Sequence, residues 1–313
     1  MAKPQPVSNG MNNKIKYATY LALGTALISG FSNFLAKIAV TAVKDPIVFT
    51  TLKNGVVGLL LTGLIIGMKK WPEIKRLTRN QWLKLGTVGI VGGFIPFALF
   101  FTGLSKTSAI NASLIHKTLF VWVLLLAIPL LKEKVSKGLL AGMALIFGAN
   151  LLIGGFTGFK FNTAELMILG ATVLWAVENI VAKKALKDLS SLTVASARMV
   201  FGSVMLLGLI AWQGNLSMLS GLNGTQWIWT LMASALLSGY VLTWYTALKY
   251  APASYVATLL VPATLVTNVL SVVFITHSLT GLMVMSGILY TAGTALVIYF
   301  ARKSELSLSP VLN

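Results

Sequence analysis

The segment Ser32-Asn33-Phe34-Leu35-Ala36-Lys37 returns 146 positions later as Glu178-Asn179-Ile180-Val181-Ala182-Lys183. The spacing between the two copies is close to half of the 313-residue chain. Each copy ends a long apolar run of the length that crosses a bilayer. The pattern therefore predicts that one membrane module occurs twice in this chain.

Composition places the chain in the membrane. It is 56% hydrophobic and 10% charged, with a mean hydropathy of +0.83, whereas soluble domains carry about 25% charged residues. The alternation typical of β-barrel strands is absent, so we expect an all-α, multi-pass protein of the cell (plasma or inner) membrane. With no cysteine, the chain offers neither disulfides nor a sulfur-ligated zinc site.

The apolar runs predict ten transmembrane helices in two groups of five. The boundaries predict a cytoplasmic tail (1–16), a first repeat (17–155), a linker (156–163), a second repeat (164–301) and a second tail (302–313). The predicted spans cover 17–40, 47–67, 82–104, 109–131, 137–155, 164–185, 192–211, 226–248, 253–275 and 280–300.

Charge distribution predicts the orientation. With the N-terminus inside, 18 of the 25 lysines and arginines fall on the cytoplasmic side, four on the outer side and three within spans. The positive-inside rule therefore puts both termini in the cytoplasm. The net charge of +18 does not indicate nucleic-acid binding, because the cations punctuate apolar runs and form no basic domain.

An odd number of spans per repeat requires the second copy to be inserted upside down. Outside the opening motif, Thr102-Gly103-Leu104 aligns with Thr246-Ala247-Leu248, and Lys53 aligns with Arg198. The sequence thus predicts an inverted-topology repeat, a common architecture of secondary transporters.

These features resemble the drug/metabolite transporter superfamily in its ten-helix EamA-type branch, over residues 17–301. The resemblance rests on a basic residue in the second helix of each half (Lys53, Arg198), on Glu133 after the fourth helix and on Pro262 in the ninth. It implies transport of a small metabolite, such as an amino acid or a related compound, by alternating access.

The chain departs from the family pattern at two places. His277 stands where the second half would carry the glutamate that corresponds to Glu133. The apolar-proline pair of the fourth helix is replaced by Lys117-Thr118, which aligns with Val261-Pro262. The lysine is therefore a candidate substrate determinant.

Ionisable residues inside spans are the first site candidates, because a charge at mid-membrane costs about 2.5–3.5 kcal/mol on insertion scales. Lys117 and Glu178 are expected to line a central cavity, where Lys117 binds an anionic group and Glu178 carries a coupled proton. The alternative is a buried Lys117–Glu178 ion pair that fixes packing. His116 is a further candidate for substrate or proton handling. Snorkelling to the interface would satisfy Lys53 and Arg198 in an architectural role.

Helical spacing supplies the remaining substrate-binding candidates. Trp175 and Asn179 share a helix face with Glu178, and Asn33 lies on the matching face of the first span. Tyr240 and Trp244 form an aromatic stripe on the eighth span. Interhelical hydrogen bonding by the asparagines and plain packing by the aromatics are the alternatives.

The function expected is a secondary transporter of a small metabolite with an anionic group, with proton coupling as an option. The alternative is a lipid-linked sugar flippase or another lipid-handling membrane protein. Enzyme motifs are missing, so we expect no catalytic residue, metal or cofactor. The expected partners are the substrate and the bilayer, with no nucleic acid, and the protein is expected to be a monomer or homodimer.

Overall fold

The computed structural model describes residues 8–43, 45–107, 109–152 and 161–303, and this part of the chain forms helices and no strand. The first half contains α1 (Ser8–Val43), α2 (Pro46–Gly67), α3 (Trp71–Lys75), α4 (Arg79–Val88), the π-helix η1 (Gly89–Phe94), α5 (Ile95–Lys106), α6 (Ala109–Lys117), α7 (Leu119–Leu131) and α8 (Lys137–Leu151). The second half contains α9 (Thr163–Ala185), α10 (Ser191–Trp212), α11 (Ser217–Ser220), α12 (Gly224–Tyr250), α13 (Ala253–Leu260), α14 (Ala263–Ser271), the π-helix η2 (Val272–Thr276) and α15 (Gly281–Lys303).

The membrane-spanning architecture expected from the sequence is confirmed. Nine helical stretches of the described chain are long and apolar enough to cross a bilayer, and α8 is a shorter tenth apolar helix. The first half supplies α1, α2, α4 with η1 and α5, α6 with α7, and α8; the second half supplies the matching five.

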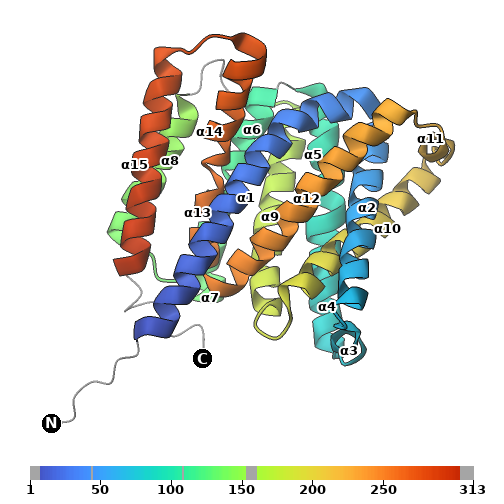
Figure 1. The fold of residues 1–313 in the computed structure, drawn as a ribbon, viewed down its shortest axis with the longest axis horizontal. Coiled ribbons are helices and arrows are strands. Elements are labelled where there is room, and N and C mark those ends of the chain that lie inside the picture. Colours follow the sequence, from blue (N-terminus) through green and yellow to red (C-terminus); the bar gives the residue numbers. More distant parts are fainter. Residues whose placement is uncertain (1–7, 44, 108, 153–160, 304–313) are drawn as a thin grey trace.

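The two halves run in opposite directions through the bundle. In Figure 1, α1 rises from the end where α15 finishes, whereas α9 descends toward that end. Both halves also interrupt one span at aligned positions: Thr118 separates α6 from α7, and Val261-Pro262 separates α13 from α14. Pro262 breaks its helix because it lacks an N–H. Thr118 stands at a matching break, where its hydroxyl donates to the Ile115 carbonyl (2.6 Å).

The ends of the chain differ in part from the expectation. Because α1 begins at Ser8, residues 8–16 of the predicted tail are helical. Residues 1–7 of that tail, 156–160 of the predicted linker and 304–313 of the C-terminal tail lie outside the described residues.

The π-helix η1 brings α4 and α5 against α10. A Cβ added to Gly93 would lie 2.1 Å from the Arg198 carbonyl oxygen, and one added to Gly202 would lie 2.3 Å from the Gly93 carbonyl oxygen. Small residues allow backbones to approach this closely in membrane bundles. The contact holds the middle of the third span against the helix that carries Arg198.

Candidate functional site

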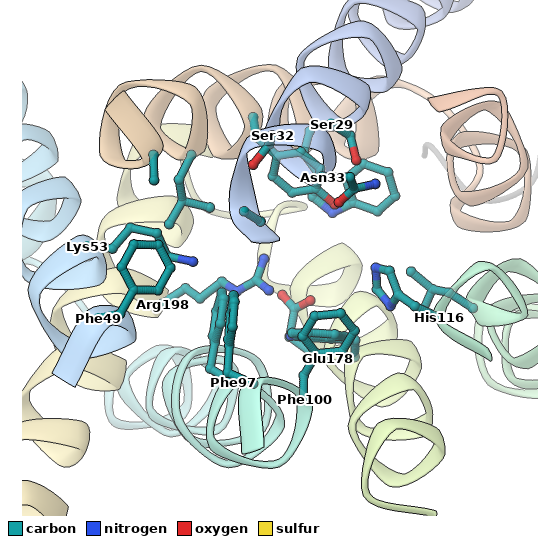
Figure 2. A pocket seen from close by; sticks show the side chains of 18 of the residues that line it. Ser29, Ser32, Asn33, Phe49, Lys53, Phe97, Phe100, His116, Glu178 and Arg198 are labelled. Carbon is teal, nitrogen blue, oxygen red and sulfur yellow. The ribbon is translucent and has the colours of Figure 1, made fainter. Parts of the chain in front are cut away.

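A central cavity of about 120 Å³ lies between the two repeats. Its walls come from α1, α2, α5, α6, α7, α9, α10 and α12. Figure 2 shows this cavity with charged side chains directed toward its middle. Seven of the eight candidates named from the sequence line it: Asn33, His116, Trp175, Glu178, Asn179, Tyr240 and Trp244.

Lys53 lies on the cavity wall within a cage of phenylalanine rings. Its Nζ is 5.2 Å from the ring centroid of Phe49, 5.1 Å from that of Phe97 and 4.4 Å from that of Phe101. Among the described residues, no carboxylate or other hydrogen-bond acceptor contacts this ammonium. Cation–π contacts are worth about 0.5–2 kcal/mol each. They offset part of the roughly 2.5–3.5 kcal/mol cost of a charge at this depth.

Arg198 lies beside Lys53 and has a fuller set of contacts. Its Nε donates to the Gly92 carbonyl (3.1 Å) and its Nη1 to the Tyr245 hydroxyl (3.4 Å). The Tyr245 hydroxyl in turn donates to the Glu178 carboxylate (2.6 Å). A guanidinium carries five N–H donors, so three remain for other acceptors. In Figure 2 the guanidinium points toward the middle of the cavity, next to Glu178.

Gly92 in η1 joins this network through its backbone. Its carbonyl accepts from both Trp175 Nε1 (3.0 Å) and Arg198 Nε. A π-helical turn leaves carbonyls outside the regular helical ladder, which is why such turns occur at functional sites. A Cβ at this position would lie 2.4 Å from Glu178 Cγ, so only glycine fits against the carboxylate.

His116 faces an aromatic wall on the other side of the cavity. Its ring centroid is 4.9 Å from that of Trp175 and 5.3 Å from that of Phe100. Its Nδ1 is buried without a hydrogen-bond partner in the described structure. The same holds for the Oδ1 of Asn179, whose Nδ2 donates to the Trp175 carbonyl (2.8 Å). Both unpaired atoms belong to residues that line the cavity, where a ligand could bind them.

Tyr240 and Trp244 complete the wall from α12. Their rings stack with centroids 5.8 Å apart and planes 12° from parallel. Both residues line the cavity, and the hydroxyl-bearing ring is the less buried of the two. The stripe predicted on this helix therefore offers a flat apolar surface to a ligand.

Lys117 does not line this cavity. It follows His116 by one residue, which turns its side chain about 100° away around the helix. The side chain is 3% exposed, and its Nζ has no hydrogen-bond partner in the described structure. The Lys117–Glu178 ion pair considered from the sequence is not formed; the ion pair found in the described chain joins Lys84 and Asp188 (3.6 Å).

One turn beyond the cavity, Lys183 closes the end of the bundle where α15 finishes. Its Nζ donates to the carbonyl oxygens of Leu248 (2.7 Å), Lys249 (3.3 Å) and Ala251 (2.8 Å). A lysine at a helix C-terminus satisfies carbonyls that have no intrahelical partner. The lysine counted in the sequence as a cytoplasmic charge therefore caps α12 from α9.

Glu133 binds the start of α13, which follows the end of α12 that Lys183 caps. Its carboxylate accepts from the backbone N–H of Ala253 (2.6 Å) and Ser254 (3.1 Å) and from the Ser254 hydroxyl (2.5 Å). A carboxylate at the start of α13 satisfies free N–H groups and suits the helix dipole. The first repeat thus holds the α12–α13 corner of the second repeat.

Lys53 and Arg198, for which the sequence favoured an architectural role with snorkelling to the interface, both line the cavity. Sequence position gives depth in a helix only roughly, and it does not tell whether a long cationic side chain turns inward or toward the interface. A signal was nevertheless present, since both repeats carry a cation at the same position within the membrane.

Comparisons with known proteins agree with the fold and the duplicated layout. The model of the EamA-like transporter family matches residues 16–155 and again 162–299. The uncharacterized transporter YyaM of Bacillus subtilis is 28% identical over 198 residues, which cover 60% of this chain and 62% of that protein. An uncharacterized transporter of Archaeoglobus fulgidus is 26% identical over 206 residues, 64% of this chain and 70% of that protein.

A third relative matches over a shorter stretch of this chain. An uncharacterized transporter of Methanothermobacter thermautotrophicus is 26% identical over 145 residues, 44% of this chain and 42% of that protein. A solved crystal structure superposes with a TM-score of 0.74 over 92% of this chain and 98% of its own, at 17% identity. At that identity the likeness shows the fold alone.

Proposed function

This chain belongs to the EamA-like transporter family, a family of multi-pass membrane proteins, and we propose on that premise that it is a secondary transporter of a small metabolite. The metabolite is an amino acid or a related compound with an anionic group. It binds in the central cavity between the repeats and crosses the membrane by alternating access. The observation that carries this proposal is a cavity at the repeat interface that combines two cations, one carboxylate and stacked aromatics.

The cavity size supports a compact substrate. Its volume of about 120 Å³ is comparable with the roughly 150 Å³ cavity that holds a benzene molecule in an engineered protein. A body of one ring, or a short branched chain, fits such a space. Polar and aromatic groups on one wall then fix its orientation.

The contacts at the end of the bundle support the alternating-access step. The cavity lining stops at Asn179 on α9 and Trp244 on α12. The next turns are sealed by Lys183 and Glu133. The charge distribution of the sequence assigns this end to the cytoplasm. Opening to that side requires these two side chains to release the α12–α13 corner.

Glu178 is the proposed proton carrier. It lines the cavity, and its carboxylate is bound by the Tyr245 hydroxyl, which also contacts Arg198. A carboxylate that faces both a substrate site and a cation can gain or lose a proton as the substrate leaves or binds. The proposal predicts that Glu178→Gln uncouples transport from a pH gradient and leaves exchange of substrate in place.

The lipid-handling alternative has less support. A second crevice of about 210 Å³ is lined almost wholly by apolar residues of α6, α7, α8 and α9, with Glu165 and Thr118 as its polar members. A flippase for a charged lipid carrier needs a basic rim at such an opening. Its lining in the described chain includes no lysine or arginine.

Reconstitution tests the proposal. The full chain is placed in liposomes loaded with a panel of amino acids and organic acids, and uptake of the labelled compound is followed with and without a pH gradient. We expect saturable exchange for at least one anionic member. Protein-free liposomes and Trp212→Ala, which alters an 82% exposed tryptophan outside the cavity, are the controls. Absence of exchange across the panel would contradict the proposal.

A further inference from the structure

The two cations of the cavity come from equivalent positions in the two repeats. Lys53 on α2 aligns with Arg198 on α10. Both lie against the ring of Phe97, Lys53 Nζ at 5.1 Å and Arg198 Cζ at 5.5 Å from its centroid. In Figure 2 both side chains reach toward the same part of the cavity. The two positive groups therefore flank one space.

Their surroundings share an aromatic contact but differ in the polar groups beside it. Each cation lies over an aromatic ring of the third or eighth span, Lys53 over Phe101 (4.4 Å) and Arg198 over Tyr245 (5.9 Å). These two rings occupy aligned positions. The tyrosine hydroxyl links Arg198 to Glu178. Phe101 has no hydroxyl, and Ser32 stands in the first repeat where the second has Glu178.

The cavity lining in the described chain therefore carries two cationic side chains but only one carboxylate. The Glu178 carboxylate is linked to Arg198 through the Tyr245 hydroxyl. Lys53, in contrast, contacts only phenylalanine rings and no hydrogen-bond acceptor in the described structure. A buried ammonium is normally paired or hydrogen-bonded. An anionic ligand would supply the missing acceptor to Lys53 and could also accept from the free N–H groups of Arg198.

We infer that Lys53 and Arg198 together form an anion-binding subsite that takes one carboxylate or comparable oxyanion of the transported ligand, one cation coming from each repeat. The apolar body of the ligand lies against Phe100 and Trp175, which also line the cavity. The substrate class is thus a compact organic anion with a flat or branched apolar body. This inference rests on the proposed function only in naming the ligand as a transported one.

The test measures binding and not transport. Thermal unfolding of the detergent-purified full chain is followed with matched pairs: isobutyrate and isobutyramide, benzoate and benzamide, phenylacetate and phenylacetamide. Phenyl phosphate distinguishes a phosphate preference from a carboxylate preference. We expect at least one anion to raise Tm by about 3 °C at a tenfold excess over its Kd, and its neutral partner to raise Tm by less than about 0.5 °C.

Variants assign that shift to the subsite. Lys53→Met places an apolar side chain of similar length among the three phenylalanine rings, so the variant is expected to fold and to lose the anion shift. Lys53→Arg is expected to keep it. Lys84→Met is the charge-matched control, because Lys84 pairs with Asp188 outside the cavity.

Three results would overturn the inference: no anion of the panel stabilises the wild-type chain, the amides stabilise it equally, or Lys53→Met keeps the full shift. Anion binding without any exchange in liposomes would contradict the proposed transport and leave the subsite in place.

Discussion

The first and second repeats keep the same chemistry at two pairs of polar cavity positions. Lys53 is matched by Arg198, and Asn33 by Asn179. Inverted repeats place equivalent residues around a shared site. The kept pairs therefore mark the part of the cavity that both halves build in common.

The repeats differ where the charge is balanced. The second repeat has Glu178 and Tyr245, which are hydrogen-bonded to each other (2.6 Å). At the aligned positions the first repeat has Ser32 and Phe101. The second half thus supplies a counter-charge for its own cation, and the first half leaves Lys53 for a ligand. We therefore expect the substrate to bind where the two repeats differ and one cation has no counter-charge.

Restoring the symmetry gives the largest expected effect. The double variant Ser32→Glu with Phe101→Tyr builds in the first repeat the pair that neutralises Arg198 in the second. We expect the affinity for the best-bound anion of the panel to fall about 100-fold, equal to about 2.7 kcal/mol, as measured by titration calorimetry. Phe101→Tyr alone adds no charge and should change the affinity less than about fivefold. Unchanged affinity in the double variant would contradict the role given to Lys53.

The second largest effect is expected at the end of the bundle that Lys183 and Glu133 close. Lys183→Met removes the donor for three carbonyl oxygens at the end of α12. We expect the free energy of unfolding to fall by about 2.5 kcal/mol, since buried carbonyl groups lose their charged hydrogen-bond donor. The neighbouring exposed lysine provides the control, Lys184→Met, with a change within about 0.5 kcal/mol.

The same variant should also open this end of the bundle. The chain has no cysteine, so a single Ala257→Cys on buried α13 can be labelled without background. Labelling should be faster when Lys183→Met is added. Equal rates with and without Lys183 would argue against a gate at this end.

Gly92 tests the close contact between η1 and the carboxylate. Gly92→Ala would put a Cβ 2.4 Å from Glu178 Cγ, and we expect it to lower the free energy of unfolding by about 2 kcal/mol. Gly86→Ala on α4 is the matched control, because a Cβ there meets nothing within 4 Å. That variant should be neutral or stabilising by about 0.5–1 kcal/mol. If both substitutions changed the free energy of unfolding in the same direction, the close contact between η1 and Glu178 would be contradicted.

The smallest effect concerns the interrupted span of the first repeat. The Thr118 hydroxyl donates to the Ile115 carbonyl and accepts from Trp122 Nε1 (3.1 Å). Thr118→Ala leaves the indole N–H without this partner, so stability should fall by about 1 kcal/mol. Thr118→Ser keeps the hydroxyl and serves as the control. Equal stability of the two variants would show that the hydroxyl does not hold the break.

Much of the fold could be predicted from the sequence. Apolar runs of bilayer length set the spans, and the repeated Asn-x-x-Ala-Lys segment set the duplication, because both signals are local and periodic. Helical spacing also placed Trp175, Glu178 and Asn179 on one face, and all three line the cavity.

The rest of the site depends on rotation around helices that no local signal fixes. His116 faces the cavity and its neighbour Lys117 does not, because one residue turns the direction by about 100°. Lys183 resembles any cytoplasmic lysine in the sequence, yet it caps α12, another helix of its own repeat. Both outcomes are decided by tertiary packing.

The central claim is that one anion is held by both repeats at once. A double-mutant cycle on Lys53→Met and Arg198→Gln, read as the affinity for the best-bound panel anion, tests it most directly. If both side chains bind the same anion, we expect a coupling energy of about 1–2 kcal/mol, with the double variant little weaker than either single one. Strictly additive losses would place the two cations on separate groups and contradict the shared subsite.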